Sequence, residues 1–267
     1  DAAEAIKRGL GVAPTDATVL IQGESGTGKE MVAQALHESS ACCGREMVTV
    51  DGGTLQETLF ESEIFGHERG AFTSAERQKK GLIEEAEGST LFLDEIGETS
   101  PAIQAKLLRV LETNTFRRLG GTRVLKANVR FVVASNRDLA EMSQAGSFRS
   151  DLYFRLASFV IHVPPLRERR EDIPLLAEHF LQRFARGIER KLTPDALQLL
   201  MVYDWPGNVR ELRNLIERAV ILAGRDGRIR AEHFGPLVAR RPDSVSLAFD
   251  HEPSLAEIKR HAREVAP

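Results

Sequence analysis

A glycine-rich segment between a short apolar run and a helical pattern constrains this chain most. Gly23-Glu24-Ser25-Gly26-Thr27-Gly28-Lys29-Glu30 follows the apolar run Thr18–Gln22 and opens a helical pattern that extends from about Lys29 to Ser39. Glycines let backbone N–H groups close around phosphate oxygens, and a helix N-terminus adds partial positive charge there. Lys29 would reach the β- and γ-phosphates. This order of strand, loop and helix predicts a nucleotide-binding P-loop.

Short apolar runs alternate with helical patterns over the first two-thirds of the chain. Besides Thr18–Gln22, the predicted strands are Met47–Val50, Leu91–Leu93, Val129–Ala134 and Phe159–Val163. The segment Ala102–Glu112 has leucines at helix spacing. Such alternation predicts an α/β fold in which a five-stranded parallel sheet is flanked by helices.

The pattern changes after Pro164-Pro165. Three helical stretches without strands follow, at Asp172–Ala185, Pro194–Val202 and Val209–Ala223. We therefore predict a nucleotide-binding α/β region over residues 1–165, a small helical lid over 166–235, and a linker with the start of a further region over 236–267. In that last part, Ser254–Val265 has the apolar spacing of an amphipathic helix that needs a surface to pack against.

Composition and charge exclude several classes of protein. Of the 267 residues, 42% are hydrophobic, and the formal net charge is −3, whereas a domain that holds DNA by itself usually has a strong basic excess. Cys42 and Cys43 are adjacent, which disfavours a bond between them, and no His or Cys cluster has zinc spacing. No apolar run approaches the ~20 residues of a membrane span. We expect a cytoplasmic protein without a membrane partner, and, because Asp1 is not a methionine, a fragment of a longer chain.

Two acids end one of the predicted strands. In Leu91-Phe92-Leu93-Asp94-Glu95 the apolar residues predict a buried strand, and its carboxyl end would lie beside the glycine-rich loop. There Asp94 could hold Mg²⁺ and Glu95 could activate the attacking water. Glu30 stands where Ser or Thr normally touches Mg²⁺ in a P-loop. The metal must therefore depend more on Asp94, water and phosphate.

These motifs resemble the central AAA+ domain of bacterial enhancer-binding proteins, the NtrC-type activators of sigma-54 RNA polymerase. The resemblance covers roughly Thr15 to Phe234, and GESGTGKE, with its final Glu30, is that family's form of the P-loop. It implies an AAA+ P-loop NTPase with a helical lid that binds ATP and Mg²⁺ and hydrolyses ATP. It also implies a ring of subunits, expected to be a hexamer, that remodels the sigma-54 closed promoter complex and so activates transcription.

The segment Glu63–Ala75 is similar to the family's ELFGHEKGAFTGA, the surface loop that touches sigma-54. The loop residues implied are Gly70, Ala71, Phe72, Thr73, Ser74 and Ala75. An exposed aromatic such as Phe72 offers a large contact area to a partner. The segment Phe116–Lys126 fits a second surface loop that moves with the first.

The resemblance assigns roles to five further residues. Asn136 is implied to orient the hydrolytic water or sense the γ-phosphate, and Arg210, at the start of a lid helix, to contact the phosphates. Arg149 and Arg155, in a segment similar to FREDLYYRL, are implied to reach the neighbouring subunit's nucleotide as arginine fingers, since a guanidinium offers fixed donors to a phosphate gaining charge. Arg167 is implied to lie near the nucleotide at the hinge before the lid.

Two departures from the family pattern leave a second function open. Ser74 replaces the usual Gly, and Ser is strained by about 1 kcal/mol where φ is positive. Asp51 replaces the Asn that holds the catalytic Glu, and an ionised Asp would repel Glu95. We therefore expect Asp51 to alter the coupling between partner contact and hydrolysis. The alternative is a nucleotide-gated oligomerising regulator of this family that no longer engages sigma-54. Ser254–Val265 resembles the first helix of a Fis-type DNA-binding domain, so DNA contact is expected through a region largely missing here.

Overall fold

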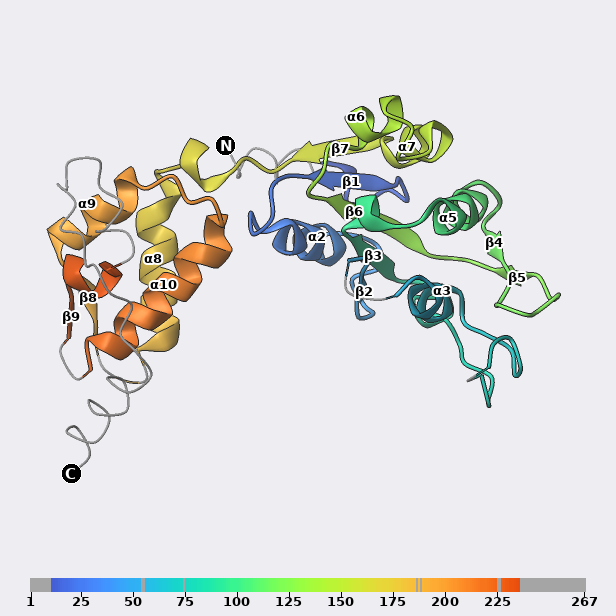
Figure 1. Cartoon of the computed structure of the whole chain (residues 1–267), viewed down its shortest axis with the longest axis horizontal. Helices are drawn as coiled ribbons and strands as arrows, with labels where there is room; N and C mark the ends of the chain where they lie inside the picture. The colour runs from blue at the N-terminus through green and yellow to red at the C-terminus, as the bar shows by residue number, and fades with distance from the viewer. Residues whose placement is uncertain are drawn as a thin grey trace, which may run out of the picture.

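The computed structural model describes residues 11–53, 56–73, 75–185, 187, 189–224 and 227–235. In this part of the chain the main sheet has five strands, all parallel, in the order β2-β3-β6-β1-β7 (Figure 1). The strands are β1 (Val19–Gln22), β2 (Val48–Asp51), β3 (Thr90–Asp94), β6 (Arg130–Ser135) and β7 (Phe159–His162). Each predicted strand is confirmed, with ends that differ by one residue.

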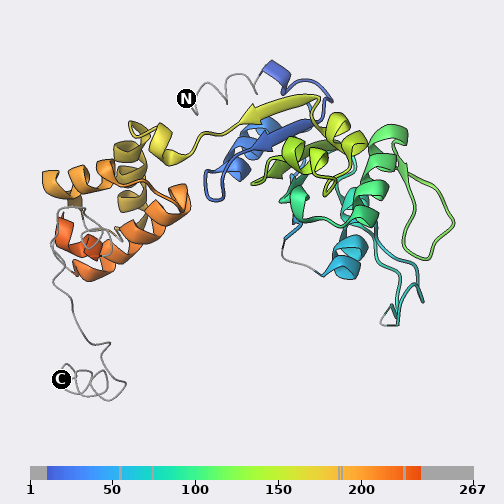
Figure 2. The same ribbon diagram turned by 45° about the horizontal axis from the view of Figure 1, so that its top comes forward.

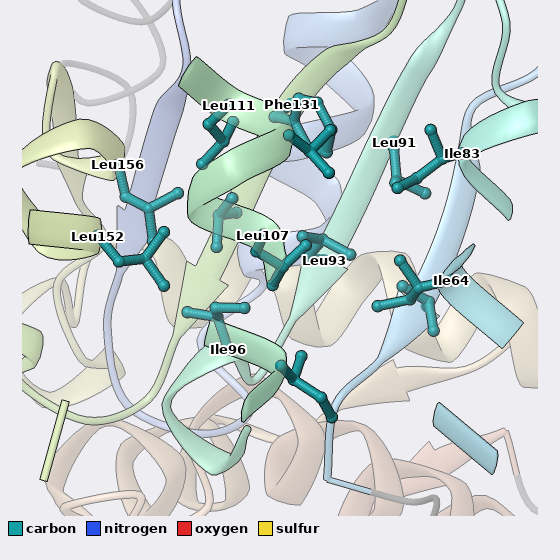
Figure 3. Packing of buried hydrophobic residues seen from close by; sticks show 14 of the residues in the cluster. Ile64, Ile83, Leu91, Leu93, Ile96, Leu107, Leu111, Phe131, Leu152 and Leu156 are labelled. Carbon is teal, nitrogen blue, oxygen red and sulfur yellow. The ribbon is translucent and has the colours of Figure 1, made fainter. Parts of the chain in front are cut away.

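Alternate residues of the strands face two different hydrophobic cores. Leu20, Leu91 and Leu93 belong to the larger core, which helices α3 (Glu57–Phe65), α5 (Pro101–Thr113) and α7 (Ser150–Leu156) cover. Figure 3 shows Leu91 beside Ile83 and Leu93 beside Leu107. Val19, Ile21 and Phe92 point to the other face, where they pack with α2 (Lys29–Glu38). Because both faces of the sheet are covered, the central strands β1, β3 and β6 are buried along most of their length, as expected for parallel strands.

The helices of the sheet region lie in the connections between strands. They are α2 (Lys29–Glu38), α3 (Glu57–Phe65), α4 (Leu82–Glu85), α5 (Pro101–Thr113), α6 (Leu139–Gln144) and α7 (Ser150–Leu156), with the short η1 (Ile96–Glu98) after β3. A hairpin of β4 (Thr115–Phe116) and β5 (Leu125–Lys126) follows α5. This hairpin and the loop after α3 extend from the end of the sheet region that lies away from the lid (Figures 1 and 2).

The lid forms a separate helical layer after the turn η2 (Leu166–Glu168). Its helices are α8 (Asp172–Phe184), α9 (Pro194–Val202), α10 (Asn208–Leu222) and η3 (Ala231–Phe234). They enclose their own core around Trp205, which is fully buried and donates its indole N–H to the carbonyl oxygen of Leu200 (2.9 Å). The prediction of a lid without strands was wrong in one detail, because β8 (Lys191–Leu192) and β9 (Arg228–Ile229) pair in parallel. Two-residue strands are too short to leave a periodic pattern in a sequence.

Cys42 and Cys43 are both free, as predicted. Within the described residues, no helix combines the length and the apolar character needed to cross a bilayer. The predicted linker and the helix Ser254–Val265 lie outside the described residues, as does Ser74.

Candidate functional site

The segment between β1 and α2 folds into a loop around the first turn of α2. Gly26 and Gly28 have φ angles of 78° and 100°, which glycine adopts without a Cβ clash. The Lys29 side chain is buried, and its Nζ donates hydrogen bonds to the carbonyl oxygens of Gly23 (2.9 Å) and Glu24 (3.1 Å). An ammonium held at such a loop can pass these hydrogen bonds to phosphate oxygens.

Two acidic residues lie at the carboxyl end of β3, at the same edge of the sheet as this loop. Asp94 Oδ1 accepts a hydrogen bond from the backbone N–H of Glu95 (2.9 Å). Burial raises the pKa of the Glu95 carboxyl, and the charges of Asp51 and Asp94 raise it further. Burial also lowers the pKa of Lys29, while the charges of Asp94 and Glu95 oppose that shift. A carboxylate with a raised pKa is suited to accept a proton near neutral pH.

Asp51 ends β2 directly beside Asp94, since the two are partners in the parallel register. Its Oδ1 accepts a hydrogen bond from the backbone N–H of Gly53 (2.8 Å). A Cβ on Gly53 would stand 2.3 Å from Oε2 of Glu95, so the Glu95 carboxylate lies against this turn. The repulsion expected between Asp51 and Glu95 agrees with the raised pKa of Glu95. Its effect on the coupling between partner contact and hydrolysis stays a prediction.

A cavity of about 200 Å³ joins the loop, the two acids and the lid. Among the residues that line it are Ser25, Lys29, Glu30, Asp94, Glu95 and Arg210. Backbone N–H groups, an ammonium and a guanidinium fit a polyphosphate. Mg²⁺ needs only one or two carboxylates besides phosphate and water, and Asp94 supplies one. The residues present therefore fit a nucleotide with its metal ion. In the described ranges, no group of three or more His, Cys, Asp or Glu side chains forms a separate metal site.

Asn136 follows β6 at the same edge of the sheet. Strand β6 lies between β3 and β1, and the backbone N–H of Gly23 donates to the carbonyl oxygen of Ser135 (3.2 Å). The side chain of Asn136 is exposed. This position is compatible with contact to a γ-phosphate or a water, and the role of Asn136 stays a prediction.

The lid meets the glycine-rich loop through charged and amide side chains. Arg167 donates two hydrogen bonds to the Glu24 carboxylate (2.6 and 2.8 Å), and Nδ2 of Asn208 donates a third (3.1 Å). The hydrogen bonds from Arg167 and Asn208 lower the pKa of Glu24 to about 2. Nη1 of Arg210 donates to Oγ of Ser25 (2.8 Å). Both predicted arginines thus lie at the loop, but Arg167 is engaged by Glu24.

Sequence reasoning missed two residues of this junction. Nη2 of Arg169, a buried side chain, donates to the carbonyl oxygen of Thr27 (2.7 Å), and Oγ1 of Thr27 donates to that of Glu24 (2.8 Å). Asn208 is fully buried, and its Oδ1 accepts a hydrogen bond from the backbone N–H of Leu166 (2.8 Å). The signal for Asn208 is its place after a Trp-Pro-Gly turn, which by itself predicts only the start of a helix.

The two predicted arginine fingers lie outside this cavity, Arg149 as the residue before α7 and Arg155 within α7. Arg149 pairs with Asp151 (2.7 and 3.0 Å), and Arg155 donates to the carbonyl oxygen of Leu111 (2.9 and 3.3 Å). Both arginines are exposed, and Phe154 between them is 72% exposed. The structure therefore does not bring either arginine to the nucleotide site of its own chain.

The predicted partner loop is a narrow hairpin with a backbone-bonded base. His67 and Lys79 exchange two backbone hydrogen bonds, and the N–H of Gly70 donates to the carbonyl oxygen of Ala75 (2.8 Å). Phe72 is half-buried, since its ring lies edge-on to that of His67, with ring centres 4.9 Å apart. The expected exposed aromatic is thus partly covered by the loop's own histidine.

The second predicted loop lies against the first. The N–H of Leu119 donates to the carbonyl oxygen of Gly66 (2.9 Å), and the N–H of Glu68 donates to that of Leu119 (3.0 Å). Arg118 pairs with Glu84 (2.6 Å) and with Glu68 (3.0 Å). The first loop lies between α3 and α4, and both helices pack in the same core as β3, the strand that carries the two acids.

Comparisons with known proteins agree with this geometry. The sigma-54 interaction domain family matches residues 1–162, and the AAA+ ATPase lid domain matches residues 167–247. The transcriptional regulatory protein ZraR of Escherichia coli K12 is 50% identical over 93% of this chain and 57% of its own length. The nitrogen fixation protein AnfA of Azotobacter vinelandii is 54% identical over 80% of this chain and 41% of its own length.

A solved structure shows the same architecture. The crystal structure of NtrX from Brucella abortus in complex with ATP is 36% identical, with a TM-score of 0.85, and the match covers 98% of this chain and 60% of that one. The chain thus spans about half the length of the curated relatives it matches. The family match favours a sigma-54 function over a regulator that no longer engages sigma-54. This chain belongs to the sigma-54 interaction domain family of AAA+ proteins and carries the AAA+ lid that follows that domain.

Proposed function

We propose that this chain hydrolyses ATP in a ring of identical subunits in the bacterial cytoplasm, and that hydrolysis remodels the sigma-54 RNA polymerase closed complex. The single observation that carries the ATPase is the cavity in which Lys29, Asp94, Glu95 and Arg210 meet. The match to the sigma-54 interaction domain family supports the partner. The crystal structure of NtrX in complex with ATP supports the nucleotide.

Each group at the cavity has a chemical task in this proposal. Lys29 and the loop N–H groups hold phosphate oxygens, while Glu95 accepts a proton from the attacking water and Asn136 orients that water. Asp94 would hold Mg²⁺, which, when bound, supplies positive charge against the phosphates. Arg210 contacts the phosphates from the lid, so that a change in phosphate charge would alter the position of the lid.

The site is completed by a second copy of the chain. Arg149, just before α7, and Arg155, within α7, are exposed and lie outside the cavity of their own chain, which supports a role for one or both in the neighbour's site. A guanidinium supplied from a neighbour can raise phosphate-transfer rates by roughly 10³–10⁵-fold. The test is ATP turnover against protein concentration, with Arg149→Ala and Arg155→Ala. We expect ATP turnover per chain to rise steeply with protein concentration in the parent and to stay low at all concentrations in at least one variant. Full turnover by a monomer would contradict the proposed ring.

We assign the contact with sigma-54 to the loop over residues 66–79, which carries Phe72 near its tip. The second loop, Phe116–Lys126, lies beside it. Contacts to phosphate would reorder these loops as ATP is split. Native gel retardation of sigma-54 by the chain with an ATP transition-state analogue tests this step. We expect the parent chain to retard sigma-54 and the Phe72→Ala variant not to do so. If the parent chain does not retard sigma-54, the ATPase acts on another protein. DNA contact would come from a region beyond the lid.

A further inference from the structure

Glu24 stands in the glycine-rich loop, but its side chain contacts the lid. Both of its carboxylate oxygens accept hydrogen bonds from Arg167, and Oε2 accepts another from Asn208. Arg167 lies in η2, and Asn208 is the first residue of α10. Glu24 therefore joins the turn that leads into the lid to the first turn of α10.

A second contact ties the same loop to the start of α10. The carbonyl oxygen of Gly26 accepts hydrogen bonds from the backbone N–H groups of Val209 (3.0 Å) and Arg210 (3.3 Å). The approach is so close that a Cβ on Gly26 would stand 2.5 Å from the carbonyl oxygen of Gly207. The first turn of α10 thus rests on the backbone of the P-loop, and Nη1 of Arg210 donates to Oγ of Ser25 in the same loop (2.8 Å).

These contacts separate two kinds of residue in the P-loop. Gly26 and Lys29 line the cavity. The Glu24 carboxylate instead accepts three hydrogen bonds from the lid, two from Arg167 and one from Asn208. A charge engaged in this way repels no phosphate, because the guanidinium of Arg167 neutralises it. The contacts of Arg167 and Asn208 hold the pKa of Glu24 at about 2, so the carboxylate stays charged near neutral pH.

We propose that Glu24 is a positioning residue that, through Arg167 and Asn208, holds the first turn of α10 on the P-loop and so places Arg210 at the γ-phosphate position. The inference rests on the proposed ATPase function, and it goes beyond it by giving Glu24 and Arg167 a task that involves no contact with the nucleotide. The Arg167–Glu24 pair is 39% and 43% exposed, and exposed ion pairs contribute little to stability. The pair is therefore suited to set the lid's position and to open during a cycle.

The affinity ratio between an ATP analogue and ADP distinguishes this role from a structural one. Arg210 at the γ-phosphate position favours the triphosphate, so Arg210→Ala should reduce the ratio by about tenfold, as expected for one charge-assisted hydrogen bond. Glu24→Gln and Arg167→Gln should each reduce the ratio in the same direction. The double variant Glu24→Gln/Arg167→Gln should be no worse than the single variants, because both changes remove the same contact. Calorimetric titration with ADP and with a non-hydrolysable ATP analogue measures these ratios.

Amide hydrogen exchange without nucleotide supplies an independent readout. The N–H groups of Val209 and Arg210 should exchange faster in Glu24→Gln than in the parent, because the first turn of α10 then leaves Gly26 more often. The matched control is Glu189→Gln, which breaks an exposed ion pair with Lys191 inside the lid (2.9 Å) and should change neither exchange nor the ratio.

Different failures of this experiment have different meanings. If Glu24→Gln weakens both nucleotides equally, or if the effects of Glu24→Gln and Arg167→Gln add, Glu24 only shapes the loop and the inference is wrong. Unchanged exchange at Val209 and Arg210 in Glu24→Gln also overturns it. A parent protein that binds neither nucleotide overturns the proposed ATPase and the placement of Arg210, while the exchange measurement still shows whether Glu24 holds α10.

Discussion

The two working ends of the sheet region differ in how much of their structure is buried. At the nucleotide end, Lys29, Thr27 and Asn208 are buried, and the lid touches the P-loop through backbone groups as well as side chains. At the loop end, backbone hydrogen bonds join the bases of the two loops, while Thr73 and Val124 near the tips are exposed. Buried dipoles give the fixed geometry that catalysis needs, and exposed tips remain free to meet a partner.

The largest expected effect lies at the nucleotide end. Replacing Glu95 by Gln removes the proposed general base while keeping the shape of the side chain, so ATP turnover should fall by roughly 10²–10⁴-fold. Nucleotide affinity should remain within a few-fold of the parent, which calorimetry checks. The matched control is Glu85→Gln, on the exposed side of α4. Turnover above about a tenth of the parental rate would mean that another group activates the water.

The next effect tests the charges that hold the two loops together. Arg118→Gln leaves Glu84 without its guanidinium partner, and these two side chains are only 13% and 17% exposed. The free energy of unfolding should fall by roughly 1–3 kcal/mol, measured by urea denaturation. Arg117→Gln is the control, since Arg117 is exposed and has no ion pair among the described residues. Equal effects of the two changes would show that the Arg118 contacts contribute nothing specific.

A smaller effect on stability is expected at the loop tip itself. Phe72→Leu removes the edge-on contact with His67, which should lower the free energy of unfolding by no more than about 1 kcal/mol. The same variant should lose sigma-54 retardation on a native gel. A large loss of stability would instead place Phe72 in the core and weaken its assignment to a partner.

The smallest effect concerns Asp51, which lies beside Asp94 at the nucleotide end. The pKa of Glu95 is raised by burial and then by Asp51 and Asp94, so the active, ionised form of Glu95 is lost as pH falls through this raised pKa. Asp51→Asn removes one repelling charge, and the acid limb of the turnover–pH profile should move to lower pH. Coupling to sigma-54 should change as well. An unmoved limb, with basal and stimulated turnover unchanged, would contradict the repulsion.

The strands and the P-loop could be predicted because their signals are local. Apolar runs such as 129–134 and the GESGTGKE segment carry their meaning within a few residues. The Glu24 contacts have no such signal, because Arg167 and Asn208 lie 143 and 184 residues further along the chain. The positive φ of Asn208 (51°), uncommon outside glycine, arises from the fold of the turn before α10 and leaves no pattern in neighbouring residues.

The loop end was only partly predictable for the same reason. The sequence indicates an aromatic tip at Phe72, but the ring contact with His67 depends on how the hairpin closes. The pairing of Arg118 with Glu68 and Glu84 joins residues 50 and 34 positions apart. Charged residues on predicted loops have many possible partners, and the structure selects among them.

Trp205 gives the lid its own optical label. It is the only tryptophan in the chain, and it lies fully buried in the lid core, 5.1 Å from the ring of Tyr203. Fluorescence excited selectively at tryptophan therefore reports on the lid, whereas circular dichroism reports on all helices and strands together. Superimposable melting curves from the two signals would mean that lid and sheet lose their structure in a single cooperative step, and separate curves would mean that each melts by itself.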